Sequence, residues 1–293
     1  MKKKKSEPYD VVMMFKILVL QRLYNLSDDQ TEYQINDRMS FMRFLGINLC
    51  EKVPDAKTIW KFKNDLAETE TVDKLFCMFD EHLENKGLIS HKGTIVDATF
   101  VDAPRQRNSR DENKKIKNGV IPEGWEKPEN KSKLAQKDID ADWTKKNGER
   151  HFGYKDHVKC DADSKLITNY SVTSASVHDS QRCLVFIGQE DEVLYADSAY
   201  SGKPIALALP ENCKNQICEK GYRNSPLTSE QKMNNRRKSR IRCRIEQIFG
   251  FMTGAMHGIT IRSIGITRAW MNIGITNLVY NFCRYSYLKR ASA

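Results

Sequence analysis

The chain has 293 residues, 40% of them apolar, which is enough to bury a full core without disulfides or a structural metal. Its formal net charge is +10, and residues 231–244 hold seven Lys or Arg and no acid. This clustering favours nucleic acid over a membrane surface as the partner, because no hydrophobic face accompanies the charge. The scattered cysteines, without a C-x-x-C pair, indicate reduced thiols in a cytosolic protein.

The N-terminal segment, MKKKKSEPYD followed by VVMMFKILVL, has the outline of a signal peptide. Glu7 and Asp10 interrupt its basic part, Lys16 breaks the apolar run, and no small-residue cleavage site follows. The apolar stretch is also too short to span a bilayer. We therefore expect a charged leader followed by an amphipathic core helix, and no membrane partner.

Helical patterns continue through residues 1–90 and predict an all-helical N-terminal domain. Ser27 is an expected N-cap, Pro54 and Asp55 open a further helix, and the last one ends at Gly87. The aromatic and basic run at 60–63 suits a helix-turn-helix-like module that inserts a helix into a DNA groove. A dimerisation or packing domain fits these short helices equally well.

A β-type pattern begins at residue 94, and the run 94–101 carries an acid, Asp97, where a buried strand would want none. From about 104 to 148 the chain is polar and poor in aliphatic residues. We expect a mobile surface insertion here.

Beyond the insertion, residues 151–176 contain two β-type runs that predict a hairpin, and 193–197 is a short strand ending in Asp197. A strand at 216–219 precedes the last two helices. The order strand, strand, strand, helix, strand, helix, strand, helix predicts an α/β (α+β) domain at 91–293, with a mixed sheet flanked by helices.

The helix expected at 236–253 has two faces. One is an apolar stripe that must be buried, formed by Ile241, Ile245, Ile248 and Met252. The remaining surface is basic and predicts phosphate contacts with DNA; its members are Arg236, Arg237, Lys238, Arg240, Arg242 and Arg244. Glu246 lies one turn after Arg242. It either makes an ordinary intrahelical ion pair or holds a metal ion against a phosphate.

Three acids are candidates for a metal site: Asp97, Asp197 and Glu246. If the strands that carry the two aspartates are neighbours, these carboxylates could hold Mg²⁺ ions for an in-line displacement at phosphorus. Three acids among 38 are a weak signal on their own. Asp102 is a competitor for Asp97, but it lies five residues later and therefore faces the opposite side of the strand.

Several ordered motifs resemble those of bacterial insertion-sequence transposases with a DDE active site, of the group named after insertion sequence five. They include VPDAKTIWKF, TIVDATFVDAP, HFGYKDHVKCD, YADSAYSG and RCRIEQIFGFM, and the resemblance covers nearly the whole chain. It implies an RNase H-like catalytic core, and it assigns the catalytic and metal-binding acids to Asp97, Asp197 and Glu246. It also implies that Arg242 belongs to the family's Arg-x-x-x-Glu signature.

Two positions depart from that signature. Ser239 stands where the family has a tyrosine, and Thr253 stands where it has a lysine. Contacts of those family side chains with phosphate or flanking bases are therefore in doubt here, with Arg240 as a nearby substitute.

Several histidines and one lysine could each have a functional or a structural role. His178 could orient a water or phosphate near the metal site, although a His-Asp pair at a helix start more often caps the helix. Lys155 could touch the DNA backbone or be an exposed strand lysine. His151 and His157 share a strand face, but nothing completes a zinc site, so they are expected to be structural.

Trp125 and Trp143 in the insertion could stack on a flipped base or hold the insertion against the core. These two readings are left open.

These observations predict a transposase that binds the terminal inverted repeats of its element and target DNA, cleaves DNA with Mg²⁺ (Mn²⁺ as a substitute) and joins the freed 3′-hydroxyls. We expect at least a dimer in the active complex, in the bacterial cytoplasm at the nucleoid. The alternatives are a non-catalytic DNA-binding protein, such as a domesticated transposase or repressor, and an RNase H-like nuclease that cuts without joining.

Overall fold

A computed structural model describes residues 8–146 and 148–291 of the chain. The basic leader at 1–7 lies outside the described residues. Two long helices organise the rest: α10 (Ser229–Thr253) and α11 (Ile266–Ala291). Of the helices in the described part, none is long and apolar enough to cross a membrane. All eight cysteines are free.

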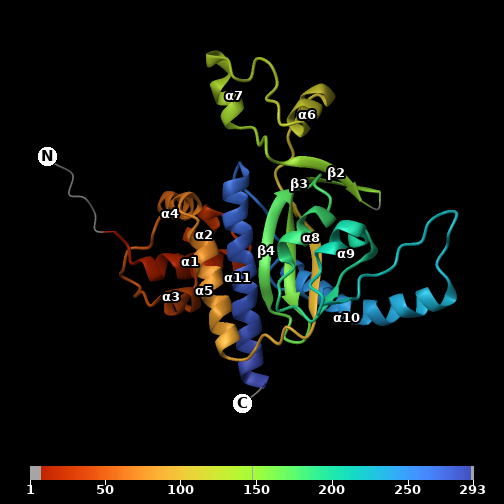
Figure 1. Ribbon diagram of the computed structural model, residues 1–293. Helices are drawn as coiled ribbons and strands as arrows, with labels where there is room; N and C mark the ends of the chain where they lie inside the picture. Colours follow the sequence, from red (N-terminus) through yellow and green to blue (C-terminus); the bar gives the residue numbers. More distant parts are fainter. Residues whose placement is uncertain (1–7, 147, 292–293) are drawn as a thin grey trace.

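The N-terminal region is helical, as predicted. Its helices are α1 (Val11–Leu23), α2 (Asp28–Asp37), α3 (Met39–Leu45), α4 (Ala56–Glu68) and α5 (Thr71–Asn85). Ser27 caps α2 in a reciprocal capping box with Gln30, and Asp55 accepts a hydrogen bond from the backbone N–H of Thr58 at the start of α4. Helices α1, α4 and α5 pack against α11 (Figure 1). Their apolar residues share one core with α11 and the sheet, so the predicted boundary near residue 90 is not marked by a break in packing.

The sheet is mixed, as predicted. Its main strands are β1 (Thr94–Asp102), β3 (Glu149–Asp161), β4 (Ile167–Ser174), β5 (Val193–Tyr195) and β6 (Lys214–Asn215). They lie in the order β4-β3-β1-β5-β6. The first three are antiparallel neighbours, as expected for the predicted hairpin, and β1, β5 and β6 run parallel. Strand β6 is shorter and begins earlier than the predicted strand at 216–219.

Helices cover both faces of this sheet. Ile95 of β1 packs in the core shared with α10 and α11, whereas the next residue, Val96, packs with α8 (Ser180–Phe186) and α9 (Lys203–Ala208). Alternate residues of a strand point to opposite faces, so Asp97 lies on the same face as Ile95, toward α10. The predicted apolar stripe of α10 is buried there, with Ile245, Ile248 and Met252 at most 1% exposed.

The polar insertion at about 104–148 differs from the expected mobile loop. It projects from the sheet (Figure 1) and contains α6 (Arg110–Lys117), a 3₁₀ turn (Pro128–Asn130), α7 (Lys131–Ala135) and β2 (Asp142–Lys146), which extends the sheet beside β3. Trp125 is 2% exposed and donates from Nε1 to Glu112 Oε1 over 2.9 Å. Trp125 thus connects the short helices of the insertion, through Glu112 of α6 and Lys133 of α7.

Candidate active site

The parallel pairing of β1 and β5 brings two of the candidate acids to the same level of the sheet. Thr94 pairs with Leu194 and Ile95 with Tyr195, so the same register, continued past the end of β5, aligns Asp97 with Asp197. Asp197 lies just beyond β5 and caps the short 3₁₀ turn at Ser198–Tyr200, accepting a hydrogen bond from Ala199 N over 2.7 Å. The strand adjacency on which the sequence prediction depended is therefore present.

Arg242 joins the third acid to the first. Its Nη1 donates to Asp97 Oδ2 over 3.0 Å, and its Nη2 donates to Glu246 Oε1 over 2.7 Å. Burial disfavours the charged guanidinium, but Asp97, Glu246 and Asp197 together outweigh this effect and raise the pKa of Arg242. Asp97 and Glu246 thus bond to one cation that belongs to the protein, and the charge of Asp197 also acts on it. We call the three acids the acid cluster.

The environments of the acids differ. The Asp97 side chain is 14% exposed, and that of Glu246 is 56% exposed. Burial raises the pKa of Asp97 to about 6, the backbone N–H of Ala98 and the charge of Arg242 oppose this rise, and the nearby Asp197 adds to it. A carboxylate that is buried beside another acid needs positive charge nearby in order to stay ionised.

The donor set of the acid cluster fits a divalent cation. Carboxylate oxygens are the hard ligands that Mg²⁺ prefers. Three carboxylates carry more negative charge than Arg242 alone neutralises. The half-exposed side chain of Glu246 makes the cluster accessible from solvent on that side. Asp97, Asp197 and Glu246 could therefore hold a metal ion.

A second acidic group lies elsewhere. Ligand atoms of His91, Glu190 and Asp191 fall within 4.8 Å of one another. The Asp191 carboxylate already accepts hydrogen bonds from Lys159 Nζ over 2.9 Å and from Thr94 Oγ1 over 2.6 Å. An internal lysine thus takes the position that a cation would need.

The six basic residues predicted on α10 divide into two groups. Three have hydrogen bonds to the protein: Arg242 in the acid cluster, Lys238 with Ile217 O, and Arg244 with Ala162 O and Asp163. The other three, Arg236, Arg237 and Arg240, are exposed, and no described residue hydrogen-bonds to their side chains. Only this second group is free to meet DNA without breaking an existing contact.

At the two positions that depart from the signature, the hydroxyl groups contact atoms of the protein itself. Thr253 donates to the carbonyl of Phe249 in its own helix over 2.9 Å. The Ser239 hydroxyl lies 3.8 Å from Cys218 Sγ. Neither hydroxyl replaces the missing tyrosine or lysine as a surface contact.

Lys155 is neither an exposed strand lysine nor free to touch the DNA backbone, the two alternatives that the sequence suggested. It is 7% exposed, and its Nζ donates to Asp179 Oδ1 and to Val177 O, each over 2.7 Å. Strand β3 lies between β1 and β4, and Asp179 at the start of α8 reaches the lysine, so the lysine is buried with a charge partner. The capping reading fits His178, whose Nδ1 lies 2.7 Å from Ser180 Oγ and accepts from Ser180 N.

The remaining histidines and tryptophans have structural contacts. His157 is fully buried, and its Nε2 lies 2.8 Å from Thr173 Oγ1. His151 stacks on Phe100 with ring centroids 4.2 Å apart, and Asp102, on the other face of β1 from Asp97, lies 3.9 Å from its Nδ1. Trp143 packs against Phe152. Trp143 thus holds the insertion against the core, as one of the two alternatives has it, whereas the contacts of Trp125 lie within the insertion.

Sequence reasoning offered the ion pair of Arg242 with Glu246 but missed its hydrogen bond to Asp97. The basic pattern of the helix predicts a phosphate contact for this residue, although its spacing of four residues from Glu246 already marks an ion pair. Its reach to Asp97 could not be foreseen, because no local pattern shows which strand faces a helix.

Comparison with known proteins gives two family matches. Residues 89–282 match the family described as "Transposase DDE domain", and residues 2–65 match "Transposase domain (DUF772)". Among solved structures, the piggyBac transposase synaptic complex with hairpin DNA is similar at 10% identity and a TM-score of 0.44, covering 98% of this chain and 70% of that one. A pre-cleavage Mos1 transpososome is similar at 9% identity and a TM-score of 0.27, covering 98% of this chain and 82% of that one.

Proposed function

The chain belongs to the Transposase DDE domain family and is a DNA transposase, and from this premise we propose that Asp97, Asp197 and Glu246 are its catalytic acids. The observation that carries the proposal is the double hydrogen bond of Arg242. It joins β1 to α10 and links Glu246 to Asp97, and the register of the parallel strands, continued past β5, aligns Asp97 with Asp197. Membership of the subgroup named after insertion sequence five stays a prediction.

The family implies a divalent metal, and we propose Mg²⁺ held by the acid cluster, with Mn²⁺ able to replace it. The ion would supply a Lewis acid for hydrolysis and transesterification at phosphorus. The protein's own part is to hold the oxygen donors. Strand β1 supplies Asp97 from a buried position, the turn after β5 orients Asp197 through Ala199 N, and α10 presents Glu246 to solvent.

Arg242 would act as the internal counter-ion that keeps the acids together in the free protein. Its guanidinium forms ion pairs with both Asp97 and Glu246 and limits the repulsion between the carboxylates. A bound divalent ion would supply positive charge to the same carboxylates, and Arg242 could then serve a phosphate oxygen, the contact that the sequence predicts for it.

For the DNA we propose the terminal inverted repeats of the element and a target site. The exposed Arg236, Arg237 and Arg240 would contact the phosphate backbone near the acid cluster. Two ends must be joined to one target, so we propose at least a dimer in the active complex. The N-terminal helices would read bases or join subunits.

The test uses purified protein and labelled DNA that carries the flanks of its own gene, with Mg²⁺ added or withheld. Glu246→Gln is compared with Glu230→Gln, which removes the same charge from the exposed first turn of the same helix. We expect Glu246→Gln to bind DNA but to lose cleavage and joining by more than about a hundredfold, since even outer partners of metal ligands contribute about 10–100-fold. Glu230→Gln should keep both activities.

Three results would contradict the proposal. Strand transfer retained by Glu246→Gln would remove this residue from the catalytic set. Cutting without joining in the unmodified protein would favour a nuclease, and specific binding without either product would favour a DNA-binding protein.

A further inference from the structure

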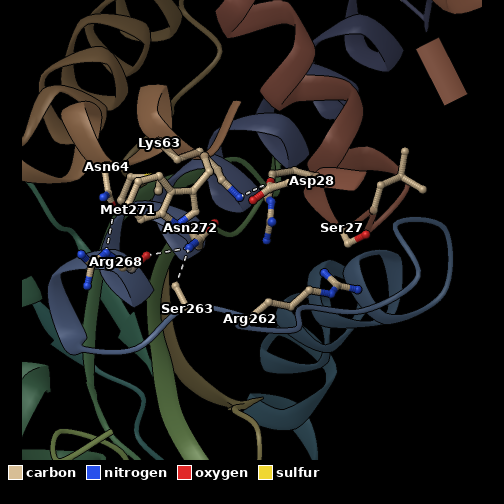
Figure 2. A pocket seen from close by; sticks show the side chains of 12 residues that line it. Ser27, Asp28, Lys63, Asn64, Arg262, Ser263, Arg268, Met271 and Asn272 are labelled. Carbon is tan, nitrogen blue, oxygen red and sulfur yellow. Dashed lines mark hydrogen bonds and ion pairs between the residues drawn. The ribbon is translucent and has the colours of Figure 1, made fainter. Parts of the chain in front are cut away.

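A second concentration of positive charge lies between the N-terminal helices and α11, away from the acid cluster. Here the side chains of Arg22, Lys63, Arg262 and Arg268 line a cavity of about 70 Å³. A single water needs roughly 10–15 Å³ of such space, so the cavity has room for a small polyatomic ion. Figure 2 shows Lys63 and Asp28 approaching it from the helices on one side and Arg262 from the loop on the other. We call it the Arg22 pocket.

The four cations of the pocket face one carboxylate, Asp28. That carboxylate is already shared, because it accepts from Lys63 Nζ and, over 2.7 Å, from Gln21 Nε2. Arg262 donates to Asn25 Oδ1 and Asn25 O over 3.1 and 3.0 Å, and Arg268 donates to Asn64 Oδ1 over 2.7 Å. These oxygens are neutral, so they satisfy hydrogen bonds without cancelling the charge.

Arg22 is the cation with the least compensation. The residue is 7% exposed, and its guanidinium makes no hydrogen bond to any residue in the described ranges 8–146 and 148–291. Burial and the charge of Arg262 lower its pKa to about 10, against an opposing effect of Asp28. The Arg22 nitrogens are not among the fully buried unpaired atoms of the described residues, so they are accessible from the cavity, where an anion would meet them.

We propose that the Arg22 pocket binds a single phosphate group. The guanidinium of Arg22 offers a planar set of donors that matches phosphate oxygens, and Arg262 enters the same space from the opposite side. A dianionic or monoanionic phosphate would also offset the excess of cations over Asp28. A halide or a carboxylate would fill less of the cavity and use fewer of the donors.

A phosphate of this kind has two sources, which are the backbone of a DNA duplex and a free phosphate or phosphomonoester. The proposal does not rest on the catalytic role of the acid cluster, and its test needs no metal ion and no cleavage. If the pocket binds no phosphate, the proposed active site is therefore unaffected. If the acid cluster is not catalytic, the proposed phosphate site is likewise unaffected.

The first arm is calorimetric titration of the full chain with inorganic phosphate, with ionic strength held constant by sodium chloride. We expect saturable binding that weakens at least about tenfold in Arg22→Met, which keeps an unbranched apolar stem and removes the guanidinium with its charge. Arg262→Met is the second variant, since this exposed residue can be changed with little risk to folding. The matched control is Arg290→Met, the same charge loss near the other end of α11, about 33 Å from Arg268 along the helix.

The second arm measures binding of a labelled duplex by the same four proteins without divalent metal, alone and in competition with phosphate. Weaker DNA binding in Arg22→Met and Arg262→Met than in Arg290→Met, with competition by phosphate, supports the proposal and assigns the site to the DNA backbone. Unchanged DNA binding, with phosphate binding lost in the two variants, supports it and assigns the site to a free phosphate. The proposal is overturned if neither phosphate nor DNA binding depends on Arg22 and Arg262 beyond the effect of the control.

Discussion

Arg242 on α10 and Asp97 on β1 lie 145 residues apart in the sequence and are joined by a hydrogen bond of 3.0 Å. The same guanidinium pairs with Glu246 one turn along the helix. A single residue therefore ties α10 to the central strand and neutralises part of the acid cluster at the same time.

The first prediction concerns this double role. Arg242→Gln should destabilise the metal-free protein by about 1–3 kcal/mol, because charged hydrogen bonds are lost and the carboxylates are left to repel one another. Added Mg²⁺ should raise the melting temperature of the variant more than that of the unmodified protein, since the ion takes over the neutralisation. Calorimetric melting with and without Mg²⁺ measures both effects. Arg240→Gln, an exposed neighbour without an acidic partner among the described residues, should show neither.

The second prediction separates the free arginines of α10 from the bound ones. Replacing Arg236, Arg237 and Arg240 by glutamine should weaken DNA binding for all sequences. It should also flatten the plot of log affinity against log salt by about 0.9 for each phosphate that the protein no longer neutralises. Arg244→Gln removes the same kind of charge but one that is bonded to Ala162 O, so its salt slope should stay unchanged. Equal slopes for the triple variant and the unmodified protein would exclude this surface from DNA binding.

The third prediction treats Lys155 as a structural cation. Its side chain and that of Asp179 are 9% and 14% exposed, and their charges lie 2.7 Å apart. Lys155→Met should lower the free energy of unfolding by about 3 kcal/mol, because it leaves a largely buried carboxylate without its partner. Chemical denaturation measures this loss.

The control for that variant is the double substitution Lys155→Met with Asp179→Asn, which should recover much of the stability. A folded, stable Lys155→Met protein with weakened DNA binding would instead restore the predicted backbone contact.

The fourth prediction follows from Asp156, which is fully buried beside Asn277 of α11. Burial raises the pKa of Asp156 to about 8, against roughly 3.9 in an unfolded chain. Between these values the folded state holds more protons than the unfolded state, so this residue makes stability fall as the pH rises from about 4 to 8.

Asp156→Asn should remove that fall. The change in the free energy of unfolding that the substitution causes should be more favourable at pH 8 than at pH 5 by at least about 1.4 kcal/mol, which corresponds to one pKa unit. Denaturation at the two pH values gives the comparison, with the exposed Asp37→Asn as the matched control. A difference between pH 5 and pH 8 that is the same in all three proteins would show that Asp156 does not control this dependence.

The sequence predicted those parts of the molecule that depend on local pattern. Ser27 and Asp55 are predictable caps because their side chains compete for nearby backbone N–H groups within three residues. The β-branched residues Thr94, Ile95 and Val96 indicate a strand, and the apolar stripe of α10 indicates a buried helix face. The identities of the candidate acids come from motif resemblance, and their assignment as catalytic ligands is still a proposal.

Contacts between distant segments were beyond such patterns. Lys155 is expected at the surface because lysine is rarely buried, yet Asp179, 24 residues later, compensates its charge. The Arg22 pocket combines residues from four separate stretches, and no spacing rule connects residue 22 with residue 262. In the insertion, the short helices contact the buried Trp125 although the surrounding sequence is polar.

Helices α1, α4 and α5 share a continuous hydrophobic core with α11 and the sheet. The distance from the Arg22 pocket to the acid cluster can therefore change only if that core opens. A duplex whose backbone is held at the pocket would present the same phosphodiester bond to the acids each time. The protein would then act as a ruler, and the point of cleavage would follow from a count of base pairs and not from the bases at the cut.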